Sequence, residues 1–214
     1  MEPMISVGCD GHHVHTLRDA EEHSDERGSI PMGRILVHEF VSLDGGYEDP
    51  SFTADYGFPD DLGASVGRLT DSSKAILLGR NTFHMFAAGW ADRTAEDDPG
   101  APFFNETPKY VVSSTLDNGD EWKNSTVLGP YDPGAIRDLK AATDGDIYVS
   151  GSGTLVRALL ADGLVDELHL LMYPVVLGSG ARLFPDGVGR LPLTLLGSES
   201  FGNGVVHLTY GPAA

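Results

Sequence analysis

A glycine-rich turn follows one of the short apolar runs of this sequence. Residues 147–149 lead into Gly151-Ser152-Gly153, and the next residues, Thr154 and Leu155, open a helical pattern. Glycines in such a turn let the backbone approach a phosphate closely, and the unpaired N–H groups of a helix start favour an anion. The turn therefore predicts a pyrophosphate site, with a plain strand-to-helix connection as the alternative.

Two further turns carry groups that suit phosphates. Gly79, Arg80 and Thr82 follow the apolar run 75–78; a guanidinium can grip a phosphate with two donors, and a hydroxyl at the helix start can add a third. The alternative is a solvated arginine beside a capping threonine. Ser113 and Ser114 end a third run, where hydroxyls can receive the 2′-phosphate that separates NADPH from NADH. Simple turn chemistry is the alternative there.

The elements that must position these turns alternate between strands and helices. Strands are expected at 35–41, 75–78, 109–113, 127–128, 147–149, 168–176 and 204–210, and helices at 59–69, 80–85, 135–142 and 154–161. This order predicts an α/β fold with a mainly parallel central sheet, helices on both faces and antiparallel C-terminal edge strands. All three turns then lie at the carboxyl ends of parallel strands, where ligands of open α/β sheets bind. Residues 91–107 are expected to form a surface loop, and His169 and His207 to lie on the less buried faces of their strands.

Length and charge limit the remaining possibilities. The 214 residues are enough for one domain, expected at 32–214, while residues 1–31 look like a poorly ordered extension. His12, His13, His15 and His23 lie in that extension, where an unstructured tail is favoured over a metal site. The net charge of −18 disfavours nucleic acid and anionic lipid as partners. The single cysteine and the lack of a long apolar stretch predict a cytoplasmic protein with no metal site and no membrane segment.

The order of the three turns resembles the cofactor-binding motifs of dihydrofolate reductase. Further motifs are similar to the bacterial family named for the C-terminal reductase domain of the riboflavin-biosynthesis deaminase-reductase, RibD. They are Ser42-Leu43-Asp44-Gly45, Phe86-Ala87-Ala88-Gly89-Trp90, Val165-Asp166-Glu167-Leu168, Pro174-Val175-Val176-Leu177-Gly178 and Leu183-Phe184. The resemblance covers residues 32–210 and is most specific between 151 and 184.

This resemblance implies a dihydrofolate reductase-like three-layer fold, NADPH as cofactor, and a homodimer. By resemblance, Arg80, Thr82, Ser113 and residues 151–155 would contact the cofactor, and Asp44 with Gly45 would lie near the nicotinamide. Dihydrofolate reductases carry a carboxylate on the helix after the first strand, and Asp61 stands in a similar setting. Such a carboxylate could orient and protonate a pterin-like ring if burial raised its pKa. An acid that only favours the helix dipole is the alternative for Asp61.

The expected function is an NADPH-dependent reductase of a small pterin- or pyrimidine-like heterocycle, resembling the 5-amino-6-(5-phosphoribosylamino)uracil reductase of riboflavin biosynthesis. The zinc-dependent deaminase domain of the two-domain enzyme is not expected, since one cysteine cannot supply its ligands. No strongly basic pocket for a ribose phosphate stands out, although Arg182 and Lys109 could contribute to one. The alternatives are a non-catalytic dimer that binds a nucleotide or metabolite, and a true dihydrofolate reductase.

Overall fold

The computed structural model describes residues 33–213, so the N-terminal extension and its four histidines lie outside the described residues. The strands are β1 (Ile35–Ser42), β2 (Ser73–Gly79), β3 (Lys109–Val112), β4 (Ser125–Gly129), β5 (Asp146–Val149), β6 (Glu167–Tyr173), β7 (Leu193–Ser200) and β8 (Val206–Pro212). The α-helices are α1 (Asp60–Ser72), α2 (Arg80–Trp90), α3 (Ala101–Glu106), α4 (Pro133–Ala142) and α5 (Gly153–Ala161), and η1 (Pro50–Tyr56) is a 3-10 helix.

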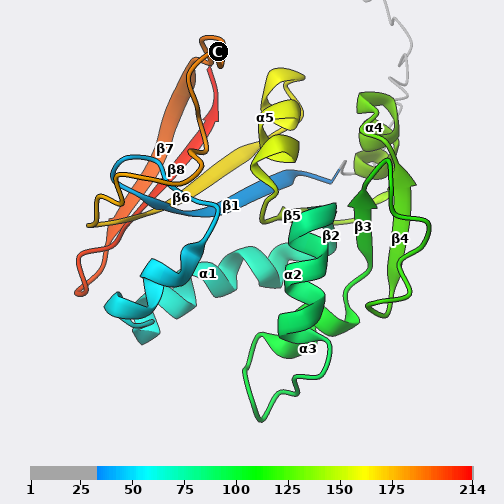
Figure 1. Ribbon diagram of the computed structural model, residues 1–214, viewed down its shortest axis with the longest axis horizontal. Coiled ribbons are helices and arrows are strands. Elements are labelled where there is room, and N and C mark those ends of the chain that lie inside the picture. The colour runs from blue at the N-terminus through cyan, green and yellow to red at the C-terminus, as the bar shows by residue number, and fades with distance from the viewer. Residues whose placement is uncertain (1–32, 214) are drawn as a thin grey trace, which may run out of the picture.

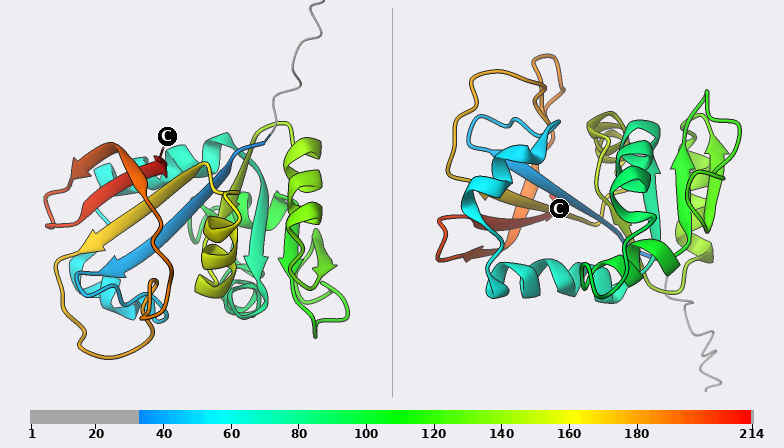
Figure 2. Two further views of the ribbon diagram at one scale, coloured as in Figure 1. Left: turned by 90° about the horizontal axis from the view of Figure 1, so that it is seen from above. Right: turned by 60° about the horizontal axis from the view of Figure 1, so that its bottom comes forward.

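The eight strands form one sheet in the order β4-β3-β2-β5-β1-β6-β8-β7. The six strands from β4 to β6 run parallel, whereas β8 is antiparallel to both β6 and β7. Helices α4 and α5 lie on one face of the sheet, and α1, α2 and α3 lie on the other (Figure 1). The expected three-layer α/β fold with antiparallel C-terminal edge strands is confirmed, and Figure 2 shows the twist of its sheet.

The core is divided by the sheet because successive strand residues point to opposite faces. Val37, Leu77 and Val149 pack under α4 and α5, while Leu36 and Ile76 pack under the helices of the other face. Most central strand residues are therefore buried on both faces, as covered parallel strands require. Rigid central strands hold the turns at their carboxyl ends in fixed positions.

Four elements depart from the sequence pattern. The expectation of a loop over residues 91–107 is wrong in its second half, where α3 forms because Phe104 is buried and stacks on Trp90 with ring centroids 4.3 Å apart. The strand expected at 168–176 ends at Tyr173, since Pro174 has no N–H for a ladder. The edge strand β7 and the helix η1 were not expected at all.

The expected exposure of His169 and His207 is also wrong. Both are buried, with 4% and 7% of their surface exposed, because α1 covers this face of β6 and β8. His169 Nδ1 lies 3.0 Å from His207 Nε2, and His207 Nδ1 lies 2.9 Å from the hydroxyl of Ser65 in α1. The two rings thus link the sheet to a helix.

Candidate functional site

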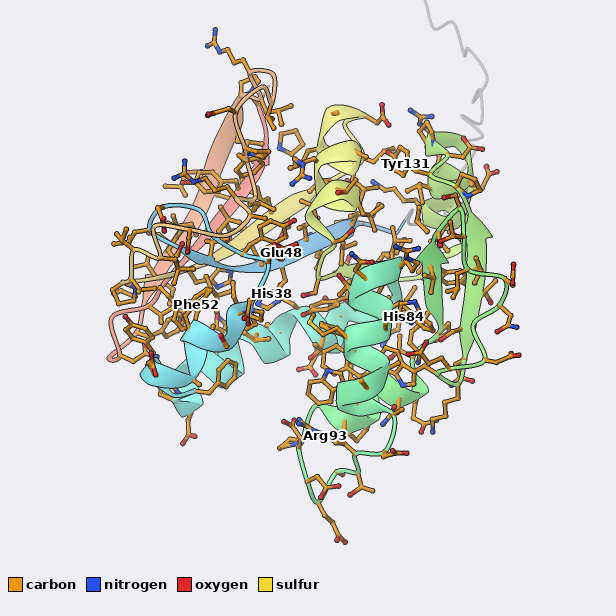
Figure 3. All side chains as sticks on the ribbon, in the orientation of Figure 1. His38, Glu48, Phe52, His84, Arg93 and Tyr131 are labelled. Carbon is orange, nitrogen blue, oxygen red and sulfur yellow. The ribbon has the colours of Figure 1, made fainter. Side chains whose placement is uncertain are left out.

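The expected turns meet at one edge of the sheet because their strands are parallel neighbours. The order β3-β2-β5-β1 places the turns after β2 and β5 side by side, with the end of β3 on one flank and the end of β1 on the other. In Figure 3, Glu48 and Tyr131 mark the two sides of this edge, with the starts of α2 and α5 between them. Two neighbouring cavities that share wall residues lie along it.

The outer compartment is a groove of about 470 Å³ between the ends of β2, β3, β4 and β5. Its lining includes Arg80, Ser113, Ser114, Thr115, Tyr131 and Leu155. The inner compartment, about 270 Å³, is lined among others by Glu39, Phe40, Tyr47, Glu48, Met85 and Phe86. Asn81, Ser152 and Thr154 line both, so a single long ligand can extend from one compartment into the other.

Two helices start at this edge without a side-chain cap. The N-cap residues are Gly79 for α2 and Ser152 for α5, and neither cap provides a side-chain hydrogen bond to the first turn. Free N–H groups and the positive ends of two helix dipoles therefore point toward the edge. This is the donor set that a pyrophosphate needs.

Arg80 supplies the cation of the outer compartment. Its Nη1 donates to Thr115 Oγ1 at 2.6 Å, which holds the exposed guanidinium across the groove beside Ser114. The hydroxyl oxygen of Ser113 accepts the N–H groups of Thr115 and Leu116, so Ser113 shapes the turn, as the alternative interpretation has it, and also lines the groove.

The turns after β2 and β5 touch one another through glycines. A Cβ added to Gly79 would lie 2.4 Å from Ser152 Oγ, and one added to Gly151 would lie 2.7 Å from Thr82 Oγ1. Gly151 also has a φ of +69°, which side-chain-bearing residues rarely adopt. The peptide bond between Gly151 and Ser152 is cis. Only glycines at 79 and 151 therefore allow this approach of the two helix starts.

The inner compartment contains a carboxyl group that is not among the expected site residues. Glu39 of β1 is only 6% exposed, and its Oε1 accepts the N–H of Gly151 at 2.8 Å. Burial raises the pKa of Glu39 to about 8, against the opposing effect of the Gly151 hydrogen bond. Glu39 is therefore mainly protonated at neutral pH. The signal that could have found it is an acidic residue inside a mostly apolar strand that is covered on both faces.

Asp44 and Gly45 lie in the turn after β1, outside both compartments. Hydrogen bonds from the Ser42 hydroxyl, and then from the N–H groups of Leu177 and Gly178, lower the pKa of Asp44 to about 2. Gly45 adopts a φ of +81° and donates its N–H to the carbonyl of Ser42. These hydrogen bonds fasten the segment after β6 to the turn, and they favour the ionised form of Asp44.

The other sequence candidates divide between the edge and the rest of the fold. Thr82 lines the inner compartment, whereas Asp61 is exposed at the start of α1 and lines neither compartment. Gly153 is buried against Tyr47, where a Cβ would lie 2.4 Å from the ring. Lys109 stands at the opposite end of β3, and its Nζ donates to the carbonyls of Phe104, Asn105 and Thr107. It is therefore remote from any ligand at the carboxyl edge.

Residues 33–213 contain no group of three or more His, Cys, Asp or Glu side chains placed to hold a metal ion. Within the same part of the chain, no helix has both the length and the apolar character needed to cross a bilayer.

Comparisons with known proteins agree with this architecture. The family model described as RibD C-terminal domain matches residues 34–207. The uncharacterized protein YyaP of Bacillus subtilis (strain 168) is 29% identical over 189 residues, which are 85% of this chain and 96% of that protein. A Shewanella sp. PV-4 structure, provisionally named a riboflavin biosynthesis protein, is 22% identical with a TM-score of 0.67 and covers 85% of this chain and 99% of its own. Dihydrofolate reductase from Enterococcus faecalis, solved with NADP(H), is 14% identical with a TM-score of 0.58, covering 86% and 98%.

Proposed function

Because the chain belongs to the RibD C-terminal domain family, we propose that it is an NADPH-dependent reductase of a small pterin- or pyrimidine-like heterocycle. The observation that carries the proposal is the pair of neighbouring compartments, with three wall residues in common, at the carboxyl edge of the sheet. One offers phosphate-binding groups and the other offers a buried carboxyl group between apolar walls. A cofactor site joined to a substrate site is the arrangement that a two-substrate reductase requires.

The residues of the outer compartment fit a phosphorylated dinucleotide. The starts of α2 and α5 offer free N–H groups to the pyrophosphate, and Gly79 and Gly151 leave room for its close approach. Arg80, Ser114 and Thr115 lie together on the far flank and suit the 2′-phosphate. Bound NADPH would supply the hydride. The protein holds its two reactants in contact through Asn81, Ser152 and Thr154, which line both compartments.

The test is a titration of the protein with NADPH and, separately, with NADH, followed by quenching of its two tryptophans. We expect tighter binding of NADPH, and a loss of roughly 10- to 150-fold in NADPH affinity in Arg80→Ala, because a charge-assisted hydrogen bond contributes roughly 1.5–3 kcal/mol. NADH affinity should change less, since it lacks the 2′-phosphate. Arg190→Ala is the control, because Arg190 is exposed and lines neither compartment. Absence of NADPH binding would refute the proposal.

We also propose that the homodimer expected from the family forms through β7. This strand lies at the edge of the sheet, all eight of its residues are exposed, and Leu195 and Leu196 are 54% and 57% exposed. An apolar edge strand favours pairing with another chain. Leu195→Lys should shift the protein from dimer to monomer in sedimentation velocity at micromolar concentration, whereas Leu43→Lys, at an exposed leucine of the β1 turn, should not. A monomeric wild type would contradict this proposal.

A further inference from the structure

The inner compartment contains no positive charge to balance its acidic groups. Its lining includes the protonated carboxyl group of Glu39 and the exposed carboxylate of Glu48, and within residues 33–213 it includes no lysine, arginine or histidine. A phosphate group placed there would meet no cation, and the net charge of −18 adds to the repulsion. The outer compartment differs, because Arg80 lies on its wall. The two compartments therefore favour different ligands, and only the outer one suits an anion.

Resting on the proposed reductase function, we propose that the inner compartment takes an unphosphorylated planar heterocycle or cyclic imine, and that Glu39 donates the proton that accompanies the hydride. Phe40, Met85 and Phe86 line the same space and offer apolar contacts to a flat ring. The proposed substrate thus lacks the ribose phosphate of the 5-amino-6-(5-phosphoribosylamino)uracil reductase reaction, although it shares the ring chemistry.

Glu39 has one carboxyl oxygen free for this task. Oε1 is occupied by the Gly151 N–H, and no hydrogen bond to Oε2 occurs within residues 33–213. Within residues 33–213, the side-chain atoms that are fully enclosed and lack a hydrogen-bond partner are His38 Nε2 and Tyr173 Oη. Oε2 of Glu39 also lacks a partner in this range but is not one of these enclosed atoms. It is therefore accessible from the compartment that Glu39 lines. A protonated Oε2 can donate to a ligand atom there. The high pKa of Glu39 keeps this proton on the carboxyl group at neutral pH.

The other carboxyl groups near the edge are poorer proton donors. Asp44 is fixed by the Leu177 and Gly178 N–H groups and is ionised, with a pKa of about 2. Glu48 is exposed to water, and Asp61 is exposed and lines neither compartment. Glu39 alone among these four combines burial with a place in the wall of the compartment.

The chemical step balances with NADPH as the reductant. A hydride adds to the carbon of a ring C=N bond, the π electrons move to nitrogen, and the Oε2 proton of Glu39 forms the new N–H bond. NADPH is oxidised to NADP⁺, and Glu39 is left as a carboxylate that the Gly151 N–H stabilises through Oε1. After product release, solvent returns a proton to the Glu39 carboxylate.

The first experiment compares two ligands that differ only in a phosphate: 5-amino-6-(5-phosphoribosylamino)uracil and its dephosphorylated form. Calorimetry with saturating NADP⁺ should show at least tenfold tighter binding of the dephosphorylated compound. Tighter binding of the phosphorylated compound would overturn the substrate assignment.

The second experiment tests Glu39 with Glu39→Gln, which keeps an acceptor for the Gly151 N–H but cannot act as an acid. We expect a fall in kcat of about 100-fold or more with NADPH and a reducible cyclic imine, while the Kd of NADPH stays within about threefold. The kcat of the wild type should fall above pH 8, and this dependence should vanish in the variant. Glu96→Gln, at an exposed loop position, is the control. Full activity of Glu39→Gln would overturn the proposal.

A third measurement is independent of turnover and of the cofactor. Infrared difference spectra of the wild type between neutral and alkaline pH should contain a carboxylic-acid carbonyl band that is missing from Glu39→Gln. If this band is absent in the wild type, Glu39 is ionised and is not the proton donor. Failure of NADPH binding with the band present would instead refute the proposed reductase function.

Discussion

Gly79→Ala is expected to lower the affinity for NADPH at least 100-fold. It should also lower the free energy of unfolding by about 2 kcal/mol, which is typical of overpacking at a close contact. The new Cβ would lie 2.4 Å from Ser152 Oγ, 3.1 Å from Ser152 Cβ and 3.3 Å from its backbone nitrogen. Rotation of the serine side chain relieves only the first of these contacts. The starts of α2 and α5 must therefore separate, and the N–H groups that both offer to one pyrophosphate lose their common geometry. Fluorescence titration and urea unfolding measure the two effects.

Gly89→Ala is the matched control, because Gly89 lies in the same helix and a Cβ there meets nothing within 4 Å. It should leave NADPH binding unchanged and stabilise the protein by up to about 1 kcal/mol. Ser152→Gly, combined with Gly79→Ala, should recover most of the lost stability, since it removes the two closest atoms. Equal NADPH affinity in Gly79→Ala and the wild type would contradict the proposed role of the close contact between the turns after β2 and β5.

The turns could be predicted from the sequence because their signals are local. Each follows a short apolar run, and a glycine beside a helix start usually marks a tight turn or a close approach of another backbone. Parallel neighbouring strands then bring the turns together whatever the details of packing. The contact of Gly79 with Ser152, and of Gly151 with Thr82, joins residues about 70 positions apart, which no local pattern encodes.

The substrate side could not be predicted in the same way, because it depends on where helices sit on the sheet. The helix around Asp61 forms as expected, yet its position leaves Asp61 exposed. The carboxyl group beside the apolar walls comes instead from Glu39, within a strand that was expected to provide only core. Likewise, β7 has no buried face, so its sequence lacks the alternation of apolar and polar residues that marks a strand. Its position is fixed instead by its pairing with β8.

The pair His169 and His207 is expected to make the protein less stable in acid. Burial lowers the pKa of each to about 4. Arg34 lowers and Asp146 raises the pKa of His169 to a smaller extent, and Arg68 and Glu199 have the same opposing effects on His207. In the unfolded chain both histidines take up a proton below pH 6.5, but in the folded protein they remain neutral until about pH 4. The unfolded state thus binds more protons in this window, so stability falls as the pH decreases from 6.5 toward 4. At pH 5 the loss is roughly 2 kcal/mol for each histidine.

Glu39 acts in the opposite direction, so a comparison of variants is needed to isolate the histidines. The folded protein keeps the Glu39 proton up to about pH 8, whereas the unfolded chain releases it above pH 4.5. The contribution of Glu39 to the free energy of unfolding therefore becomes more favourable as the pH decreases from 8 toward 4.5. His169→Gln/His207→Gln removes only the histidine contribution. Urea unfolding at pH 7.5 and at pH 5 should show that the free energy of unfolding falls less with acidification in the double variant than in the wild type, by roughly 2–4 kcal/mol.

His84→Gln is the control for this comparison, because His84 is partly exposed on α2 and lies outside the buried network. His84→Gln should alter the change in the free energy of unfolding between pH 7.5 and pH 5 by less than about 0.5 kcal/mol, as surface substitutions usually do. Identical pH responses of the wild type and the double variant would mean that the two buried rings are already charged at pH 5. The hydrogen bonds to Glu167 and Ser65 would then stabilise the protonated pair enough to outweigh burial.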